Sequence, residues 1–344
     1  MRTAIRAATA AVAAVATLAL TGSALAANTA IVSASTAGTA TTLHFSVPQT
    51  TDPIAAITIF VPAGYTANLS QAASTTIGSV DSTALAHDGG LTLPLSGPVT
   101  TTSPVTPASD TCSPGTHGAI WNLNLSVAGQ TLVLPLYVDP TSGAATSLGA
   151  YQMLICLPPW DVPVGTPGRS FEGAQLLDAQ FTVNNIFTAP TSGLNVWHTL
   201  FTPYNPGLGT VNPAGTFEAR ALAGTPSLSF KATKKKGKYV VSGKLSEGGL
   251  PVAGASVVFL RGTSATRFAQ AGSPKTSATG TWSASGKLTG KKLVYFKATA
   301  TVAERDATAT GCATPLPATI APGGCTSATL SRWTISSPVA KLKP

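Results

Sequence analysis

Hydrophobic and polar residues alternate along most of the chain with the period of two that a half-buried β-strand requires. The stretch WNLNLSVAGQTLVLPLYV, residues 121–138, shows this alternation twice, with Ala128-Gly129 as a turn between the two runs. The pattern predicts an antiparallel hairpin with one buried face. Pro135 has no N–H to donate to a ladder, so we expect the second strand at a sheet edge or at a bulge.

Most of residues 27–224 follow the same rule. Apolar residues alternate with polar ones over 43–47, 57–61 and 177–183, and turn-forming clusters such as 87–90 lie between such runs. Strands separated by turns rich in Gly and Asp are typical of a β-sandwich. After the N-terminal segment, no stretch shows a convincing helical period.

A second, smaller set of alternating runs fills residues 225–344, and the longest of them covers 294–302. About 110 residues with roughly seven strands is the size of one immunoglobulin-like domain. The predicted fold class is therefore all-β, with two β-sandwich domains in tandem, the second of them immunoglobulin-like.

The N-terminus has the features of a secretory signal peptide. Two arginines precede an apolar run at 7–20, and Ala24-Leu25-Ala26 supplies the small-residue pattern of a cleavage site. The run has 14 residues, fewer than the roughly 20 that a membrane-spanning helix needs, which disfavours a transmembrane anchor. We expect residues 1–26 to be removed and the remaining chain to be a secreted bacterial protein without a transmembrane segment.

Four cysteines follow the signal peptide, an even number that predicts two disulfides in an oxidising compartment. Three pairings are open, and the local one joins Cys112 to Cys156 and Cys312 to Cys325. If disulfides stabilise mainly by lowering the entropy of the unfolded chain, bridges that close loops of these lengths stabilise the fold by about 4 and about 3 kcal/mol. A metal site is the alternative, but the chain has no C-x-x-C spacing and its histidines do not cluster.

Charge divides the chain into two unlike halves. Residues 27–224 hold two basic and nine acidic residues, a net charge of −7, whereas residues 225–344 hold 17 basic and three acidic residues, a net charge of +14. The change falls at AGTPS, residues 223–227, which has the Gly and Pro content of a linker. We therefore predict a signal peptide at 1–26, an acidic β-sandwich domain at 27–224 and a basic immunoglobulin-like domain at 225–344.

Lysines are absent from the first 230 residues and then gather in KATKKKGKYVVSG, residues 231–243. Several lysines on one face would concentrate anions in a salt-dependent way. Extracellular anions include envelope polymers, lipid headgroups and nucleic acid, but no feature here would read bases, so no specific nucleic acid is expected. The alternatives are a solubilising surface and docking onto an acidic domain. The candidate polyanion-binding residues are Lys231, Lys234, Lys235, Lys236, Lys238, Lys291 and Lys292, with additional charge from Lys287, Lys297, Lys341 and Lys343.

Catalytic motifs are missing from the sequence. It has no G-x-S-x-G, no H-E-x-x-H and no phosphate-binding glycine loop. The four histidines lie in separate segments, where we expect exposed strand or loop positions, and the acidic residues are scattered. We predict that the protein is not an enzyme and has no catalytic residue, cofactor or metal ligand, although calcium bound by loop aspartates stays an alternative.

Two proline-containing loops offer possible ligand contacts. Trp160 lies in CLPPWDVPVGTPG, residues 156–168, and Tyr204 lies in FTPYNPGLG, residues 201–209. An exposed aromatic side chain on a stiff loop can stack on a sugar or anchor a protein partner. The competing interpretation is that Trp160 caps the core beside the proposed disulfide, and Tyr204 has the same ambiguity.

The basic half contains VSGKLSEGGLPVAGASVVFL, TSATGTWSASGKL and LVYFKATA. Across residues 227–302 this sequence resembles a bacterial immunoglobulin-like repeat and the related regulatory domain of carboxypeptidases. The resemblance implies a sandwich that acts as a spacer, an adhesive module or a stabiliser. The matching positions are Gly243, Pro251, Gly254, Val257, Gly280, Trp282 and Ala298.

Residues 40–65, which include TTLHFSVPQTTDPIAAITIFVPAGY, are similar to the start of YcnI-like secreted copper-binding proteins. In that family a histidine at the mature N-terminus binds copper. Here the mature chain is expected to begin Ala27-Asn28, so the ligand is absent and no copper site is implied.

These observations predict a secreted, non-enzymatic, envelope-associated structural or adhesive protein. Its basic half would contact an anionic cell-envelope polymer or another surface protein. The alternative is an extracellular sandwich protein that binds carbohydrate or calcium, with the basic half as a spacer. The oligomeric state is not predicted.

Overall fold

A computed structural model describes residues 28–127, 129–288, 292–305 and 329–344. These residues form β-strands and loops with three short 3-10 helices, so the prediction of an all-β fold is confirmed. None of the helices in these ranges has the length and hydropathy to span a bilayer. The expected signal peptide, the Cys312–Cys325 pair and Lys291 lie outside the described residues.

The acidic half, residues 27–224, contains strands β1 to β13. Their bounds and those of the 3-10 helices are β1 (Ile31–Ala37), β2 (Ala40–Ser46), β3 (Ile54–Val61), β4 (Thr66–Ala67), β5 (Thr76–Ala86), β6 (Leu91–Thr102), β7 (Ala119–Val127), β8 (Gln130–Pro140), η1 (Gly143–Ser147), β9 (Tyr151–Cys156), η2 (Phe171–Gly173), β10 (Ala174–Asn184), β11 (Phe187–Thr188), β12 (Asn195–Pro203), η3 (Pro213–Gly215) and β13 (Phe217–Ala223).

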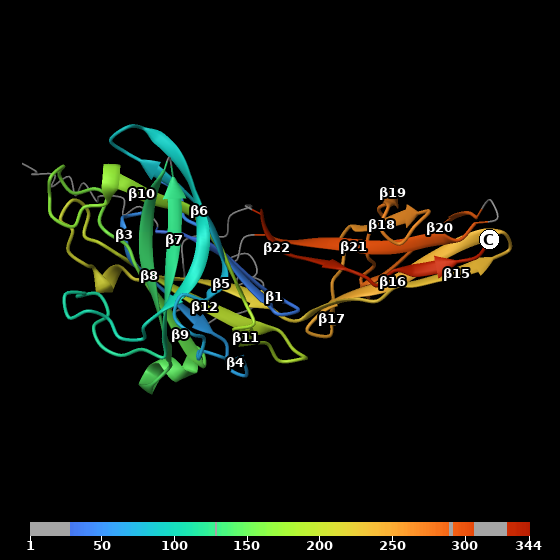
Figure 1. The fold of residues 1–344 in the computed structure, drawn as a ribbon, viewed down its shortest axis with the longest axis horizontal. Coiled ribbons are helices and arrows are strands. Elements are labelled where there is room, and N and C mark those ends of the chain that lie inside the picture. Colours follow the sequence, from blue (N-terminus) through green and yellow to red (C-terminus); the bar gives the residue numbers. More distant parts are fainter. Residues whose placement is uncertain (1–27, 128, 289–291, 306–328) are drawn as a thin grey trace, which may run out of the picture.

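A single antiparallel sheet provides both layers of the acidic half. Its 11 strands follow the order β1-β2-β10-β5-β6-β7-β8-β9-β3-β12-β13, and β4 pairs separately with β11. The sheet curls until its two outer strands, β1 and β13, lie against each other (Figure 1). Phe45 of β2 and Phe201 of β12 are far apart in this order, yet their ring centroids lie 6.4 Å apart. The sandwich predicted from the alternation is therefore one sheet folded over itself.

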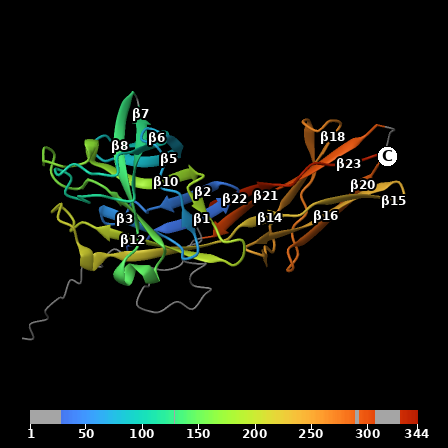
Figure 2. The same cartoon turned by 60° about the horizontal axis from the view of Figure 1, so that its bottom comes forward.

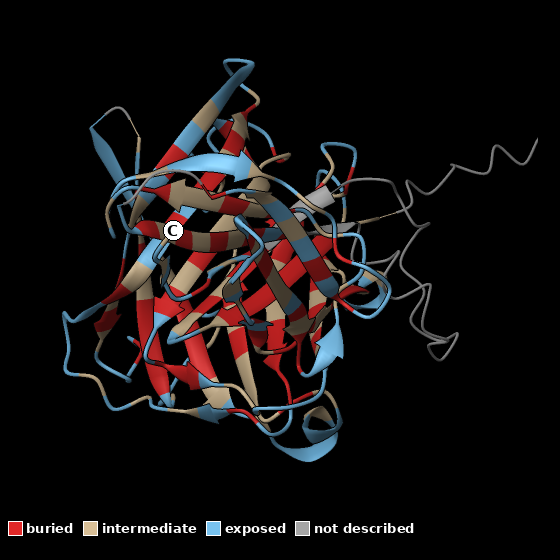
Figure 3. Ribbon diagram, turned by 90° about the vertical axis from the view of Figure 1, so that its right-hand side faces the viewer, coloured by how far each residue is buried: buried red, intermediate tan, exposed pale blue. Residues whose placement is uncertain are grey.

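Alternate side chains of this sheet enclose an apolar core. Trp121, Trp197, Phe45, Phe201 and Leu136 are each exposed by 1% or less. Along β2, buried positions alternate with half-buried ones, and Figure 3 shows buried positions in red on many strands. Burial of each large apolar side chain stabilises the fold by roughly 1.5–3 kcal/mol. This alternation in space is the one that the sequence pattern predicted.

The hairpin predicted at 121–138 corresponds to β7 and β8. Pro135 lies opposite Asn122 of β7, whereas the ladder between β8 and β9 runs only from Leu136 to Pro140. β8 is therefore interior along one part of its length and has a free edge along the rest. The prediction that this strand lies at a sheet edge is therefore right only for the part of β8 that contains Pro135. There, β8 has no second partner strand to which Pro135 would have to donate a backbone N–H.

The basic half, residues 225–344, contains strands β14 to β23. Their bounds are β14 (Pro226–Leu228), β15 (Lys231–Lys235), β16 (Lys238–Glu247), β17 (Leu250–Pro251), β18 (Val257–Gly262), β19 (Phe268–Gly272), β20 (Thr281–Lys287), β21 (Val294–Arg305), β22 (Thr329–Ser336) and β23 (Ala340–Leu342).

Two sheets form the sandwich of the basic half. In one sheet, β14, β15, β17 and β20 all pair with β16, and the other sheet has the order β19-β18-β21-β22, with β23 also on β21. Val241, Leu245, Trp282 and Phe296 belong to an apolar core that is separate from the core of the acidic half. The predicted second sandwich is therefore present.

Backbone groups join the two halves at a contact lined by glycines. Gly193 N donates to Gly248 O over 2.8 Å, and Gly224 N donates to the Glu247 carboxylate over 3.0 Å. A Cβ added to Gly248 would lie 2.0 Å from Gly193 O, so a larger residue would force this contact apart. The linker expected at 223–227 is thus short and hydrogen-bonded. The two halves lie end to end in both views (Figures 1 and 2).

Candidate polyanion-binding surface

A tight hairpin places several of the predicted lysines at one end of the basic half. Strands β15 and β16 are joined by Lys236-Gly237, whose φ angles are 47° and 71°. Two successive positive φ values define a type I′ turn, which suits the twist of a two-residue hairpin. Lys235 and Lys238 close this hairpin as directly opposed residues. The short turn therefore crowds charged side chains together.

Lys238 is also directly opposite Lys287 of β20. Opposed residues of antiparallel strands point to the same face, with Cβ atoms roughly 4.5–5.5 Å apart. Lys235, Lys238 and Lys287 thus form a row of cations across three neighbouring strands. The next residue, Tyr239, points to the other face and is buried in the core, being 6% exposed. The lysine row therefore lies on the outer face of the sheet.

Further lysines surround this row. Leu288 N donates to Gly237 O over 3.1 Å, which brings the end of β20 beside the turn. Strand β23 pairs with the start of β21 and lies against β15, so residues near the C-terminus reach the same end. Figure 1 shows that this end is the one farthest from the acidic half. We name it the basic tip, and its exposed lysines are Lys234, Lys235, Lys236, Lys238, Lys287, Lys292, Lys341 and Lys343.

No acidic residue of the described ranges belongs to the basic tip. Residues 225–344 contain only Glu247, Glu304 and Asp306. Glu247 is buried at the junction, Glu304 lies in the part of β21 that is distant from β23, and Asp306 is outside the described residues. Among the residues that the structure describes, no lysine forms an ion pair. The described part of the chain therefore provides no carboxylate that pairs with the lysines of the tip.

The structure brings together most, but not all, of the candidate set. Five of its members belong to the basic tip, whereas Lys231 lies at the far end of β15, opposite Ser242. Lys287, Lys341 and Lys343, which the sequence offered only as additional charge, complete the tip. Lys297 lies opposite Leu260 on the other sheet and so is not part of the row formed by Lys235, Lys238 and Lys287. Strand alternation alone could not reveal Lys287, because its position depends on which strand pairs with β16.

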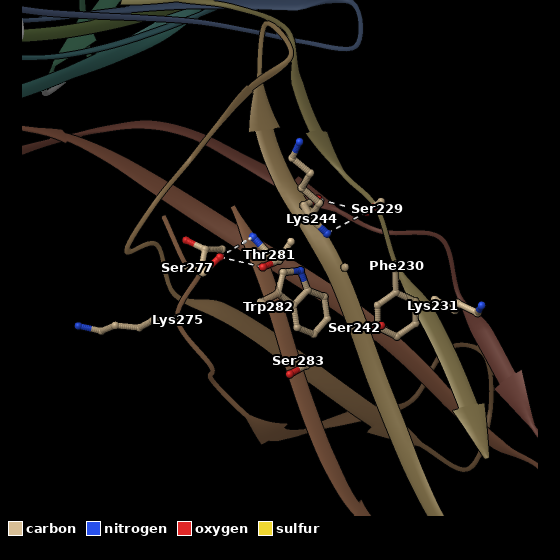
Figure 4. Close-up of a pocket in the computed structure, with 12 residues that line it drawn as sticks. Ser229, Phe230, Lys231, Ser242, Lys244, Lys275, Ser277, Thr281, Trp282 and Ser283 are labelled. Carbon is tan, nitrogen blue, oxygen red and sulfur yellow. Dashed lines mark hydrogen bonds between the residues drawn. The ribbon is translucent and has the colours of Figure 1, made fainter. Parts of the chain in front are cut away.

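A groove with a volume of about 810 Å³ lies on the same sheet, between the basic tip and the junction (Figure 4). Gly243 of β16 lies opposite Trp282 of β20. The rings of Phe230 and Trp282 stack beside this glycine with centroids 5.9 Å apart. A Cβ on Gly243 would lie 1.9 Å from Ser229 O and 2.8 Å from the Trp282 indole nitrogen. Because Gly243 has no Cβ, the rings of Phe230 and Trp282 can pack against each other beside it.

Three lysines, Lys231, Lys244 and Lys275, line this groove. In Figure 4, Lys231 and Lys275 extend in opposite directions from it. Their ammonium groups do not converge on one point, as they would around a small anion. The arrangement instead spreads positive charge over the surface of the sheet.

The aromatic candidates lie in the acidic half, away from the lysines. The half-buried Trp160 stacks on His87, with ring centroids 4.0 Å apart and an interplanar angle of 7°. The Tyr204 hydroxyl donates to Leu157 O over 2.7 Å, and burial raises its pKa. Gly207 N donates to the Asp161 carboxylate over 2.5 Å, which joins the two loops. Stacking therefore covers one face of Trp160, and a hydrogen bond fixes Tyr204.

The cysteines and histidines of the acidic half link segments that are distant in sequence. Cys112 and Cys156 form a disulfide, so this member of the local pairing is confirmed.

The expectation of exposed histidines is wrong, because each histidine is half-buried and bonded to a side chain from a segment distant in sequence. In the described ranges, no three His, Cys, Asp or Glu side chains gather into a group that could hold a metal. The histidine contacts are His44–Asp178 at 2.9 Å, His87–Gln175 at 2.9 Å, His117–Asp139 at 2.8 Å and His198–Glu218 at 2.5 Å.

His117 differs from the other histidines in that both of its ring nitrogens face acceptors. Nδ1 lies 2.8 Å from Asp139 Oδ2, and Nε2 lies 3.0 Å from Ser113 O. Neither oxygen can donate a hydrogen bond, so the ring satisfies both contacts only as an imidazolium. Burial lowers the pKa of His117, but the bonds to Asp139 and Ser113 outweigh burial and raise the pKa above its ordinary value. The geometry and the pKa therefore agree on a charged ring.

Comparison of the chain with protein-family models gives no match, and comparison with curated proteins gives no significant match.

Proposed function

We propose that the protein is an exported, non-enzymatic component of the cell envelope whose basic tip attaches it to anionic surface polymers. The observation that carries the proposal is the row formed by Lys235, Lys238 and Lys287, on a tip that lacks acidic side chains among its described residues. The Cys112–Cys156 disulfide supports export, because disulfides persist in oxidising compartments.

Electrostatic attachment follows from the exposure of these lysines. Exposed charges interact over roughly 10 Å at an ionic strength of about 0.1 M and over shorter distances as salt increases. A cluster of one sign raises the local concentration of counter-ions and speeds association with a polyanion. Attachment through the basic tip is therefore expected to be rapid and salt-sensitive. Its selectivity would rest on charge and spacing.

The end-to-end arrangement gives the acidic half a separate role. With the basic tip on the envelope, the acidic half lies at the opposite end of the molecule. Its net charge of −7 would be repelled by the same polymers. We propose that the acidic half is displayed away from the anionic surface, where its loops contribute the specific interaction of the protein.

Cosedimentation with isolated cell envelope tests the attachment. The variant Lys238→Gln/Lys287→Gln removes two charges from the lysine row of the tip. The control Arg267→Gln/Lys297→Gln removes two charges from the other sheet, where Arg267 directly precedes β19 and Lys297 lies in β21. A basic residue near an anionic surface contributes about 1 kcal/mol, so the tip variant should bind at least about tenfold more weakly at low salt. The control should bind like the wild-type chain. Equal binding by both variants would contradict the proposal.

A further inference from the structure

We infer that the anionic partner is an extended linear polymer with an anionic group in each repeat. It would lie along the outer face of β15, β16 and β20 from the basic tip to the groove. This inference rests on the proposed function, which it deepens by defining the shape of the ligand. Its basis is a continuous surface of lysines and hydroxyl groups, which we name the lysine track.

The pairing of the three strands fixes the composition of the lysine track. Beyond the row of Lys235, Lys238 and Lys287, successive outer-face rows follow at every second residue. The second row consists of Thr233, Val240 and Ser285, the third of Lys231, Ser242 and Ser283, and at the fourth row Lys244 lies opposite Thr281. The track thus has lysines at both ends and mainly hydroxyl groups between them. It contains no acidic residue.

The alternation of burial assigns the track to the outer face. Along β16, the residues between track positions include Tyr239 and Val241, which are exposed by 6% or less. The track residues of β16 are exposed or half-buried. The same holds on β20, where Trp282 is 4% exposed while Ser283 and Ser285 are exposed. The hydroxyl and ammonium groups are therefore on the side of the sheet away from its core.

The length of the track selects an extended ligand over a compact one. From Lys238 to Lys244 the strand advances six residues, which at roughly 3.4 Å per residue is about 20 Å. A compact anion reaches the lysines at only one end of this distance. A linear polymer can neutralise both ends and accept hydrogen bonds from the Ser and Thr hydroxyls between them.

The lysines suit a partner that is recognised by charge and not by a fixed geometry. Lysine presents a compact ammonium on a flexible stem, whereas arginine presents a rigid fork that matches a single carboxylate or phosphate. The track contains no arginine. The shared chemistry is a regular series of anionic groups, whether phosphodiesters or sugar carboxylates.

Inorganic polyphosphate is the probe for a test with the full-length chain. We compare pyrophosphate with linear polyphosphate long enough to span about 20 Å, using three variants that each lose two charges. The track variant is Lys231→Gln/Lys244→Gln, the tip variant is Lys238→Gln/Lys287→Gln, and the control is Arg267→Gln/Lys297→Gln. All of these side chains are exposed except Lys297, which is half-buried, so the folds should be retained.

The expected result separates the two ends of the track. The track variant should bind long polyphosphate several-fold more weakly than the control and bind pyrophosphate equally well, whereas the tip variant should lose affinity for both. If the track variant binds long polyphosphate like the control while the tip variant is impaired, the extended ligand is contradicted and the proposed function stands. If the tip variant also matches the control, the proposed function itself fails. Replacing polyphosphate with polygalacturonate in the same comparison then distinguishes phosphate-bearing from carboxylate-bearing polymers.

Discussion

Lys238 of β16 lies directly opposite Lys287 of β20, and on its other side it lies opposite Lys235 of β15. Like charges that face each other across a sheet destabilise it. No described carboxylate forms an ion pair with these lysines. A sequence that breaks such a local rule usually does so at a functional site, which is why this row is central to our account.

Charge reversal in the row should stabilise the protein. Lys287→Glu places a carboxylate opposite Lys238 and replaces repulsion with attraction. The free energy of unfolding should rise by roughly 0.2–1 kcal/mol at low ionic strength, with a smaller gain in high salt. Urea denaturation measures this change. Lys297→Glu is the matched control, because Lys297 faces Leu260 and no like charge. If both variants have the same stability, the lysine row is not a source of repulsion.

A substitution in the turn between β15 and β16 should also raise the free energy of unfolding. Lys236 has a φ of 47°, a left-handed conformation that Asn and Gly adopt more readily than Lys. Lys236→Asn should therefore stabilise the protein by about 1 kcal/mol while removing one charge from the tip. Thermal unfolding measures the stability, and cosedimentation with envelope measures the loss of binding. Lys234→Asn removes the same charge from a strand position and should bring no gain. An equal effect of both substitutions on stability would contradict this explanation.

Alanine substitutions at two neighbouring glycines, Gly248 and Gly249, test the contact between the two halves. Gly248 and Gly249 both have positive φ angles, 55° and 83°, so alanine is strained at either position. Only at Gly248 would the added Cβ meet another atom, Gly193 O at 2.0 Å, since nothing lies within 4 Å at Gly249. Gly248→Ala should cost about 1–3 kcal/mol more than Gly249→Ala. It should also broaden the interdomain distance distribution measured by small-angle scattering.

Equal stability of the two junction variants, together with unchanged scattering, would show that the contact between Gly193 and Gly248 does not hold the two halves in place.

His117 should make the loop at 103–118 sensitive to pH. Its folded pKa is raised by hydrogen bonds to Asp139 and Ser113, and Asp110 and Tyr137 are the other titratable groups beside it. A raised pKa means that its stabilising contribution is complete below about pH 6.5, the unfolded value. This contribution is lost as the pH rises through the folded value. Hydrogen exchange in the loop should therefore accelerate, beyond the intrinsic rate increase, over that range.

His117→Gln should abolish this pH dependence. His44→Gln is the control, because Nδ1 of His44 has no partner and a neutral ring satisfies its bond to Asp178. An NMR titration that places the pKa of His117 at or below about 6.5 would contradict the imidazolium assignment.

The sequence predicted the parts of the fold that depend on local alternation. Residues 121–138 give β7 and β8, and the runs at 43–47 and 57–61 fall within or overlap β2 and β3. The single folded sheet was not predictable, because the approach of β1 to β13 depends on packing over the whole acidic half. The edge position of Pro135 was only partly predictable for the same reason, because it depends on how far β9 extends along β8.

The candidate site shows the same limit. The cluster at 231–238 could be identified because its lysines are adjacent in sequence. Lys287 joins it only through the register of β16 and β20, which are separated in sequence by β17 and by two strands of the other sheet. The histidine contacts were missed likewise, since His44 and Asp178 are 134 residues apart. Charge counted by segment could identify the basic half, but not the face on which its charges gather.

The most direct measurement is the salt dependence with which the full-length protein binds isolated envelope. Affinity is measured over a range of ionic strength for the wild-type chain, Lys238→Gln/Lys287→Gln and Arg267→Gln/Lys297→Gln. Our account predicts that binding by the wild-type chain weakens steeply as salt increases, that the control follows the same line, and that the tip variant binds more weakly with a shallower slope. Binding that is independent of salt, or a tip variant that follows the control line, would contradict attachment through the basic tip.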